Sequence, residues 1–123
     1  MQQQNTQTLA AVERLNRAVN DHDLHALASI FTEDCVFENT YPPPDGERFE
    51  GLPAVLGFWE DFFGSSQGAR FEFEEIFPAG DRCVARWIYR WESLDGEPHH
   101  LRGVDILRVR EGKVSEKLSY VKG

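Results

Sequence analysis

The spacing at which apolar residues recur changes once along this chain, and that change limits its possible folds more than any other feature. In the first half, apolar side chains such as Leu9, Val12 and Leu15 recur at the spacing of an amphipathic helix. From Arg70 onward, apolar and charged residues alternate, which is the spacing of a strand with one buried face. Helices followed by a set of consecutive strands predict an α+β domain.

The predicted elements form a single domain over residues 1–123, in the order helix, helix, strand, helix and four further strands. Asp23 is a suitable N-cap for the second helix, and Pro53 suits the first turn of the third. The polar residues 1–6 are expected to be frayed. Helices are expected at 7–20, 24–31 and 53–64. Strands are expected at 35–41, 70–77, 82–92, 98–110 and 113–121.

Composition and motif content exclude several classes of function. The chain has 13 basic and 21 acidic side chains, a formal net charge of −8, which argues against a nucleic acid partner. No apolar run is long enough for a membrane span and no secretion signal is visible, so we expect a cytoplasmic protein that does not bind a membrane. Cys35 and Cys83 lack CxxC spacing, which is typical of reduced core thiols. His22 and His25 have no companion ligands, so neither a metal nor another cofactor is expected.

Alternation within the strands identifies the buried face of the predicted sheet. Over 82–92 three arginines share one face, so the opposite face, with Trp87 and Tyr89, must be covered. Over 35–41 the inner face includes Asn39 and Tyr41. Over 98–110 arginines again mark the outer face. Asp105 therefore falls on an otherwise apolar inner face.

Asp105 is the anomalous residue of this sequence. Aspartate is a poor strand former, and a lone buried carboxylate is costly unless it is paired, hydrogen-bonded or protonated. Burial raises the pKa of a carboxyl group toward the range useful for acid–base catalysis. Two interpretations remain open: a catalytic acid or base, and a structural carboxylate bonded to a neighbour.

The register of the last hairpin decides which residue lies opposite Asp105. A two-residue turn would require Glu111 at positive φ, so we expect a three-residue loop in which Gly112 alone is left-handed. That register places Lys117 opposite Asp105 and puts Ser119 on the same inner face. An inner Asp105–Lys117 ion pair follows, unless Lys117 extends outward to water. The two-residue alternative exchanges the two faces.

The opposite face of the last two strands carries its own apolar set: Val104, Ile106, Leu118 and Tyr120. Side chains of this kind on the outer face of a sheet are typical of a partner surface. A symmetric homodimer through this face is the simplest arrangement that covers them.

Several segments resemble the nuclear-transport-factor-2-like superfamily, in particular its SnoaL-like (polyketide cyclase) type. The resemblance covers almost the whole chain and is carried by Asn20–Leu24, Phe31–Phe37, Phe49–Gly51 and Gly103–Val114. It implies a cone, in which a strongly curved, mostly antiparallel sheet wraps around three helices and leaves an apolar pocket at the open end. Members of this superfamily are commonly dimers, so the resemblance also implies a homodimer.

The resemblance carries over to the catalytic positions only in part. Asp105 matches an aspartate that related ketosteroid isomerases use, protonated, as an oxyanion donor. Their general base falls at Asn39 and their oxyanion tyrosine at Leu15, so isomerase chemistry of that kind is not expected. Similar epoxide hydrolases use an aspartate where this chain has Ser119. SnoaL-like cyclases use one acidic residue, for which Asp105 is the candidate, with His99 as the best substitute for its histidine partner.

Two hypotheses follow from the sequence. The first is a cofactor-free enzyme of cyclase or isomerase type, in which Asp105 acts as acid–base or hydrogen-bond donor on a small apolar or cyclic molecule. The second is a non-catalytic module of the same fold that binds a ligand or dimerises. The expected pocket residues are Asn39, Tyr41, Trp59, Trp87, Tyr89, His99, Lys117 and Ser119.

Overall fold

A computed structural model of the chain describes residues 2–66 and 68–123. Its helices are α1 (Gln2–Asn20), α2 (Leu24–Ile30) and α3 (Leu52–Ser65). Its strands are β1 (Phe31–Glu38), β2 (Arg48–Glu50), β3 (Arg70–Ala79), β4 (Arg82–Glu92), β5 (Pro98–Arg110) and β6 (Lys113–Val121). None of the helices in this described part combines the length and the apolar character needed to cross a membrane.

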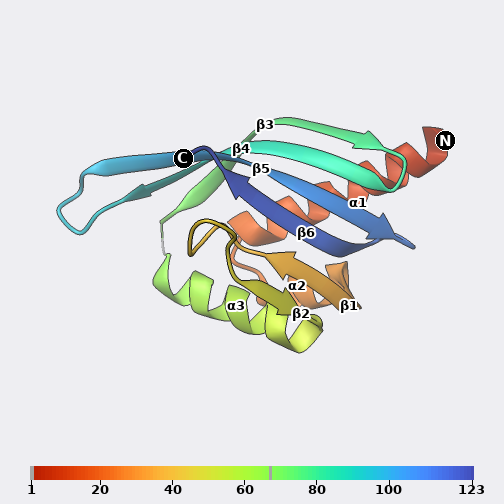
Figure 1. Cartoon of the computed structure of the whole chain (residues 1–123), viewed down its shortest axis with the longest axis horizontal. Helices are drawn as coiled ribbons and strands as arrows, with labels where there is room; N and C mark the ends of the chain where they lie inside the picture. Colours follow the sequence, from red (N-terminus) through yellow and green to blue (C-terminus); the bar gives the residue numbers. More distant parts are fainter. Residues whose placement is uncertain (1, 67) are drawn as a thin grey trace.

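The strands form one curved sheet in the order β2-β1-β6-β5-β4-β3 (Figure 1). β1 and β6 run parallel, and the other neighbours are antiparallel. α1 packs along β3, β4 and β5, whereas α3 packs on β1 and β2. The predicted α+β architecture, with a mostly antiparallel sheet wrapped around helices, is therefore confirmed.

The core lies between the concave face of the sheet and the helices. Val12 and Leu15 from α1, Leu27 from α2 and Leu107 from β5 are fully buried there. The face of β4 that carries its tryptophans points inward as predicted, and its three arginines face outward, where two pair with glutamates of β3 and the third with a glutamate of β6. Burial of these apolar faces is the main stabilising contribution to the fold.

The N-terminal segment differs from the prediction, because α1 begins at Gln2 and residues 2–6 are helical rather than frayed. The Asn5 Oδ1 atom accepts a hydrogen bond of 2.7 Å from Gly80 N, and Thr8 Oγ1 donates one of 2.7 Å to Gly80 O. These contacts tie the first turns of α1 to the β3–β4 turn, a contact that sequence periodicity cannot reveal. Met1 lies outside the described residues.

The first strands also differ from the prediction. The predicted order has no counterpart of β2, because the three residues Arg48–Glu50 are too few to display alternation. β1 begins at Phe31, which pairs with Val114 of β6, and it ends at Glu38 instead of Tyr41. Beyond Glu38 the chain forms a loop through Pro42–Gly46 that returns to β2.

The last hairpin has the two-residue turn rather than the expected three-residue loop. Glu111 and Gly112 both have positive φ, 52° and 77°, and Arg110 pairs with Lys113. A register shift then follows: Val109 pairs with Val114 while Arg108 pairs with Glu116, so Ser115 is the extra residue of a bulge. The bulge reverses the exchange of faces that the short turn would have caused.

Gly103 on β5 allows a tryptophan to lie against the sheet. Gly103 pairs with Trp87 of β4, and a Cβ atom added to Gly103 would lie 2.4 Å from Trp87 Cη2 and 2.4 Å from the Tyr120 carbonyl oxygen. Any other residue at this position would force the indole ring or the backbone of β6 to move.

We therefore expect Gly103→Ala to lower the free energy of unfolding by roughly 1–3 kcal/mol, the usual cost of overpacking. Gly57→Ala in α3 is the matched control, because nothing lies within 4 Å of an added Cβ there. Alanine in a helix interior should stabilise by roughly 0.5–1 kcal/mol. Urea denaturation measures the unfolding free energy of both variants. An equal change in the two variants would contradict this packing argument.

The two free thiols provide a pH test of the core. Burial raises the pKa of Cys35 and of Cys83 to about 11 from an ordinary value of 9.0. Because the folded state favours the protonated thiols, the free energy of unfolding should be level below about pH 9 and fall between about pH 9 and about pH 11. Urea titrations on either side of about pH 9 measure this loss. The double variant Cys35→Ala/Cys83→Ala should lose less, and the same loss in both proteins would contradict the assignment.

Candidate functional site

A cavity of about 110 Å³ lies between α3 and the concave face of the sheet. Its rim includes Leu101 and Val121, which are exposed, so the cavity reaches the surface. Six of the residues predicted to form a pocket line it: Asn39, Trp59, Trp87, Tyr89, Lys117 and Ser119. The structure thus brings together side chains from the end of β1 and from α3, β4 and β6.

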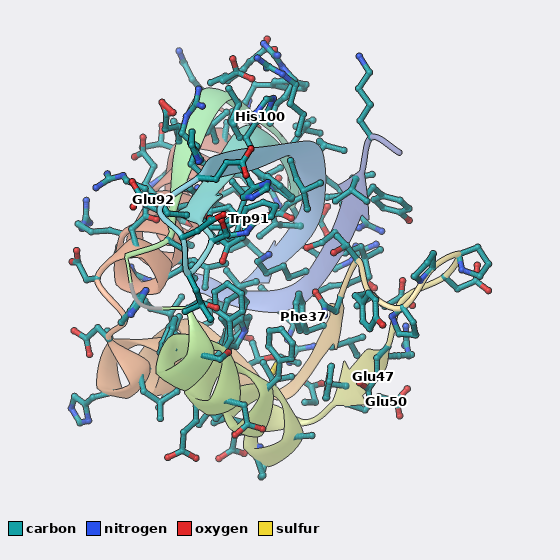
Figure 2. The ribbon with its side chains drawn as sticks, turned by 90° about the vertical axis from the view of Figure 1, so that its left-hand side faces the viewer. Phe37, Glu47, Glu50, Trp91, Glu92 and His100 are labelled. Atoms are coloured by element: carbon teal, nitrogen blue, oxygen red, sulfur yellow. The ribbon has the colours of Figure 1, made fainter. Side chains whose placement is uncertain are left out.

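The walls of the cavity are aromatic. Phe37 of β1 packs against Phe58 and Trp59 of α3, with ring centroids 4.9 Å and 5.2 Å apart. On the opposite side Phe71 of β3 meets Trp87 edge to face at 5.1 Å. Seen from the end of the β4–β5 hairpin, Phe37 lies between α3 and the sheet (Figure 2). Such walls favour a flat apolar ligand.

The Asn20 side chain anchors the wall formed by Phe71, because it makes the two backbone hydrogen bonds that a neighbouring strand would make. Asn20, at the end of α1, donates from Nδ2 to the Phe71 carbonyl oxygen at 2.9 Å and accepts from Phe71 N at 2.8 Å. This pair of bonds satisfies the edge of β3 where no further strand covers it. It fixes the position of the Phe71 ring relative to α1.

The floor of the cavity is polar, because three inner-face residues of β5 and β6 form a closed network. Lys117 Nζ lies 3.1 Å from Asp105 Oδ2 and donates a 3.1 Å hydrogen bond to Ser119 Oγ. The Ser119 hydroxyl donates to Asp105 Oδ1 at 2.6 Å. Asp105 lies directly opposite Ser119, and Lys117 lies opposite Leu107, so the ion pair runs diagonally across the two strands.

The ion pair is withdrawn from water. Asp105 is 2% exposed and Lys117 is 5% exposed. The Lys117 ammonium also lies 5.0 Å from the centre of the Phe37 ring and 5.5 Å from that of Trp59, which is the geometry of a cation–π contact. Lys117 and Ser119 border the cavity, whereas Asp105 lies behind them and does not. The carboxylate therefore reaches the cavity only through its two partners.

Two hydrogen-bond donors beside the cavity lack partners. The indole Nε1 atoms of Trp59 and Trp87 are buried, and neither has a hydrogen-bond acceptor among the described residues. A buried donor that is left unsatisfied costs about 1–3 kcal/mol, so each such group requires an explanation. Burial also raises the pKa of the Tyr89 phenol, partly offset by a hydrogen bond with Ser66, so this wall stays neutral.

Two predicted pocket residues lie elsewhere. Tyr41 is 71% exposed, because β1 ends at Glu38 and the alternation that placed Tyr41 inside does not continue into the loop. His99 is exposed and stacks on Trp91, with ring centroids 5.4 Å apart, on the hairpin that extends beyond the cavity. Figure 2 shows Trp91 beside the hairpin residues Glu92 and His100.

Sequence reasoning did not identify several wall residues: Phe37, Phe58, Phe62, Phe71 and Leu101. Alternation in β3, where Phe71 and Phe73 lie between charged residues, was a usable signal for one of them. Phe58 shares one face of α3 with Val55, Trp59 and Phe62, at the spacing i, i+3, i+4 and i+7, so helical periodicity was a usable signal for it. It reaches the cavity because α3 crosses the end of the sheet beside β1 and β2.

The remaining surface offers no competing centre of this kind. No group of three or more histidine, cysteine, aspartate or glutamate side chains within 2–66 and 68–123 could hold a metal ion. A larger hollow of about 600 Å³ lies where α1 and α2 meet the β5–β6 turn. Its walls carry exposed charges of both signs, among them Arg17, Asp21 and Lys113, and no buried polar group converges on it.

The buried ion pair makes a strong prediction about stability. Lys117→Met leaves the Asp105 carboxylate without its cation, and Asp105→Asn leaves the ammonium without its anion. Each change should cost about 3–5 kcal/mol of unfolding free energy, and the double variant should cost clearly less than the sum. A double-mutant cycle in urea measures the coupling. If each single variant loses less than about 1 kcal/mol of unfolding free energy and the two losses add, the ion pair contributes no more to stability than an exposed surface pair.

Comparison with known proteins places this architecture among proteins of one family. The model of the SnoaL-like domain matches residues 12–117. A solved NTF2-like protein of unknown function from Mesorhizobium loti is 40% identical, with 97% of this chain and 93% of that chain covered and a TM-score of 0.83. No protein of curated function matches the sequence.

Two more distant structures share the fold. An LEH-like epoxide hydrolase from M. tuberculosis is 17% identical, with 96% of this chain and 80% of that chain covered and a TM-score of 0.77. A protein with a ketosteroid isomerase-like fold from Catenulispora acidiphila, solved in complex with trimethylamine, is 16% identical. There 89% of this chain and 83% of that chain are covered, with a TM-score of 0.77. At such identities the likeness concerns the fold alone.

Proposed function

This chain belongs to the SnoaL-like domain family, and from that premise we propose that it binds a small single-ring molecule with a neutral hydrogen-bond acceptor, such as a carbonyl group. The binding site is the cavity between α3 and the sheet. The observation that carries the proposal is a mainly aromatic cavity with a buried, paired ammonium at its floor and two indole N–H groups buried beside it without acceptors.

The size of the cavity limits the ligand. A dry apolar cavity of about 150 Å³ in another protein accommodates benzene. The cavity of this chain, about 110 Å³ with an open rim, is suited to one ring whose substituent extends toward the rim. Steroids and anthraquinones, whose fused rings are several times larger, are not expected to enter without movement of α3.

The polarity of the cavity selects the functional group of the ligand. Trp59, Trp87 and Lys117 all offer donors, so the ligand should bring an acceptor. Lys117 is already neutralised by Asp105, and no other charged side chain borders the cavity. A carboxylate would therefore add an unpaired charge to a buried site, whereas a carbonyl oxygen would not. An amine would meet the Lys117 ammonium, in contrast to the trimethylamine complex of the distant neighbour.

The residues take the following roles in this proposal. Lys117 and Ser119 form the polar floor, and the aromatic walls provide the contact area. In binding, Asp105 is a positioning residue that fixes both floor groups from behind. Asn39, at the end of β1, is placed to contact a polar substituent of the ligand.

Titration with four single-ring compounds of similar size tests the proposal. Benzaldehyde should bind more tightly than toluene, and both more tightly than benzoate and benzylamine, measured by NMR line shifts of cavity residues. Trp59→Phe removes the N–H donor but keeps an aromatic ring. It should therefore weaken the binding of benzaldehyde by about fivefold and leave the binding of toluene unchanged. Trp91→Phe, outside the cavity, is the matched control. Binding of none of the four compounds would overturn the proposal.

A second proposal concerns the outer face of the sheet, where a second copy of the chain is the expected partner. One apolar row crosses four neighbouring strands, because Phe77 pairs with Val84, Val84 with Ile106 and Ile106 with Leu118. Tyr120, 51% exposed, lies beside this row. The flanking charges are of both signs, as in the Arg102–Glu74 pair at 3.1 Å, so the surface can complement itself across a twofold axis.

Light scattering after size exclusion tests this proposal. The protein should have the mass of a dimer, and Ile106→Glu should have the mass of a monomer because it places a charge in the centre of the apolar row. His100→Glu, on the same outer face but at the protruding hairpin, should remain dimeric. A monomer at millimolar concentration would contradict the proposal.

A further inference from the structure

We propose that the Lys117 amine forms an imine with the carbonyl group of the bound ligand. This inference rests on the proposed carbonyl-binding function and adds a covalent step to it. Lys113, Lys117 and Lys122 are the lysines of the chain. Lys117 alone among them is buried and borders the cavity, while the other two are exposed.

Stability alone gives a weak reason for this lysine. A buried ion pair contributes little more than apolar residues of the same volume would, because the desolvation of both charges offsets their attraction. The surrounding side chains, Phe37 and Trp59, are apolar and would pack well against a methionine or leucine in place of Lys117. Stability therefore does not explain why a charged pair is buried here. Its lysine is the one that borders the cavity.

The immediate surroundings of Lys117 contain the groups that imine formation needs. Asp105 Oδ2, 3.1 Å from Nζ, is the base positioned to take one proton from the ammonium in the step that frees the amine for attack. Ser119 Oγ, 3.1 Å from Nζ, holds the amine at the floor of the cavity and donates its own proton to Asp105 Oδ1.

The step balances in atoms and charge. The amine lone pair forms a C–N bond to the carbonyl carbon while the C=O π electrons move to oxygen. A proton then moves from the new ammonium nitrogen to that oxygen to give a carbinolamine. The hydroxyl group then leaves as water, taking a proton from Ser119 Oγ, which recovers one from Asp105, and the nitrogen lone pair forms the C=N bond. The net reaction converts one ammonium and one aldehyde into one protonated imine and one water. Asp105 returns to its carboxylate form and pairs with the new cation as it did with the ammonium.

The test is reductive trapping on the folded protein. Benzaldehyde and sodium cyanoborohydride convert an imine into a stable benzylamine, which fragmentation mass spectrometry locates on Lys113, Lys117 or Lys122. We expect Lys117 to be labelled about tenfold faster than the two exposed lysines, because the cavity holds the reacting groups together. In urea this preference should disappear, because the three lysines are then equally accessible.

Two variants complete the experiment. Lys117→Arg keeps the positive charge beside Asp105 but cannot form an imine, so labelling at this position should be lost and only the slow labelling of the two exposed lysines should remain. Lys113→Arg is the matched control and should leave the labelling of Lys117 unchanged. Asp105→Asn, if folded by circular dichroism, should slow the labelling of Lys117 more than it weakens the binding of toluene.

The outcomes separate the two proposals. If benzaldehyde binds in the cavity by NMR but Lys117 is labelled no faster than Lys113 and Lys122, the imine is excluded and the binding function stands. If benzaldehyde and toluene both fail to bind, the binding function itself is wrong. Rapid labelling of Lys117 that persists in urea would also overturn the inference, because it would not depend on the cavity.

Discussion

The ion pair between Asp105 and Lys117 is the constraint on which the rest of this structure depends. Two opposite charges withdrawn from water require a partner at close distance and hydrogen bonds for their remaining polar atoms. Here the Ser119 hydroxyl supplies those bonds to both charges. The network fixes β5 and β6 relative to one another at the point where the sheet faces α3. It also leaves two of its three members, Lys117 and Ser119, at the floor of the cavity.

Several local features serve this arrangement. The bulge at Ser115 returns Lys117 and Ser119 to the inner face after a turn that would have directed them outward. Gly103 leaves room for the Trp87 ring against β5, and Asn20 holds β3 so that Phe71 forms the opposite wall. A change at any one of these positions would alter the cavity without touching a ligand. The site is therefore a property of the hairpin, the sheet edge and α3 together.

The polarity of the cavity connects this architecture to function. Enzymes and binding proteins of the shared fold differ in the polar groups they place on an apolar lining, so fold alone does not determine the chemistry. In this chain the polar groups at or beside the cavity are a paired ammonium, three hydroxyls, an amide and two indole N–H groups. The proposed preference for a neutral acceptor rests on this set, which also contains an amine held close to a carboxylate.

The α+β class, the bounds of the last three strands and the inner position of Asp105 could be predicted from the amino-acid sequence. These follow from alternation, which depends only on the covalent geometry of an extended chain. The inner position of Lys117 and Ser119 was predicted from the register of the last hairpin. The register of the last hairpin was predicted wrongly, and the faces were nevertheless correct, because the bulge compensates for the shorter turn. A bulge depends on contacts between strands, so it cannot be predicted from a local sequence pattern.

Which of these residues border the cavity depends on tertiary contacts that the sequence pattern does not contain. Tyr41 is exposed because β1 ends before it, and His99 lies on the protruding hairpin. By strand alternation alone, both would belong to the inner face. The tertiary structure also added Phe58, Phe62 and Phe71, which reach the cavity through the crossing of α3 over the sheet edge and the anchoring of β3 by Asn20. Finally, it set Asp105 behind its partners rather than on the cavity wall, because residues paired across a twisted sheet differ in depth even when they share a face.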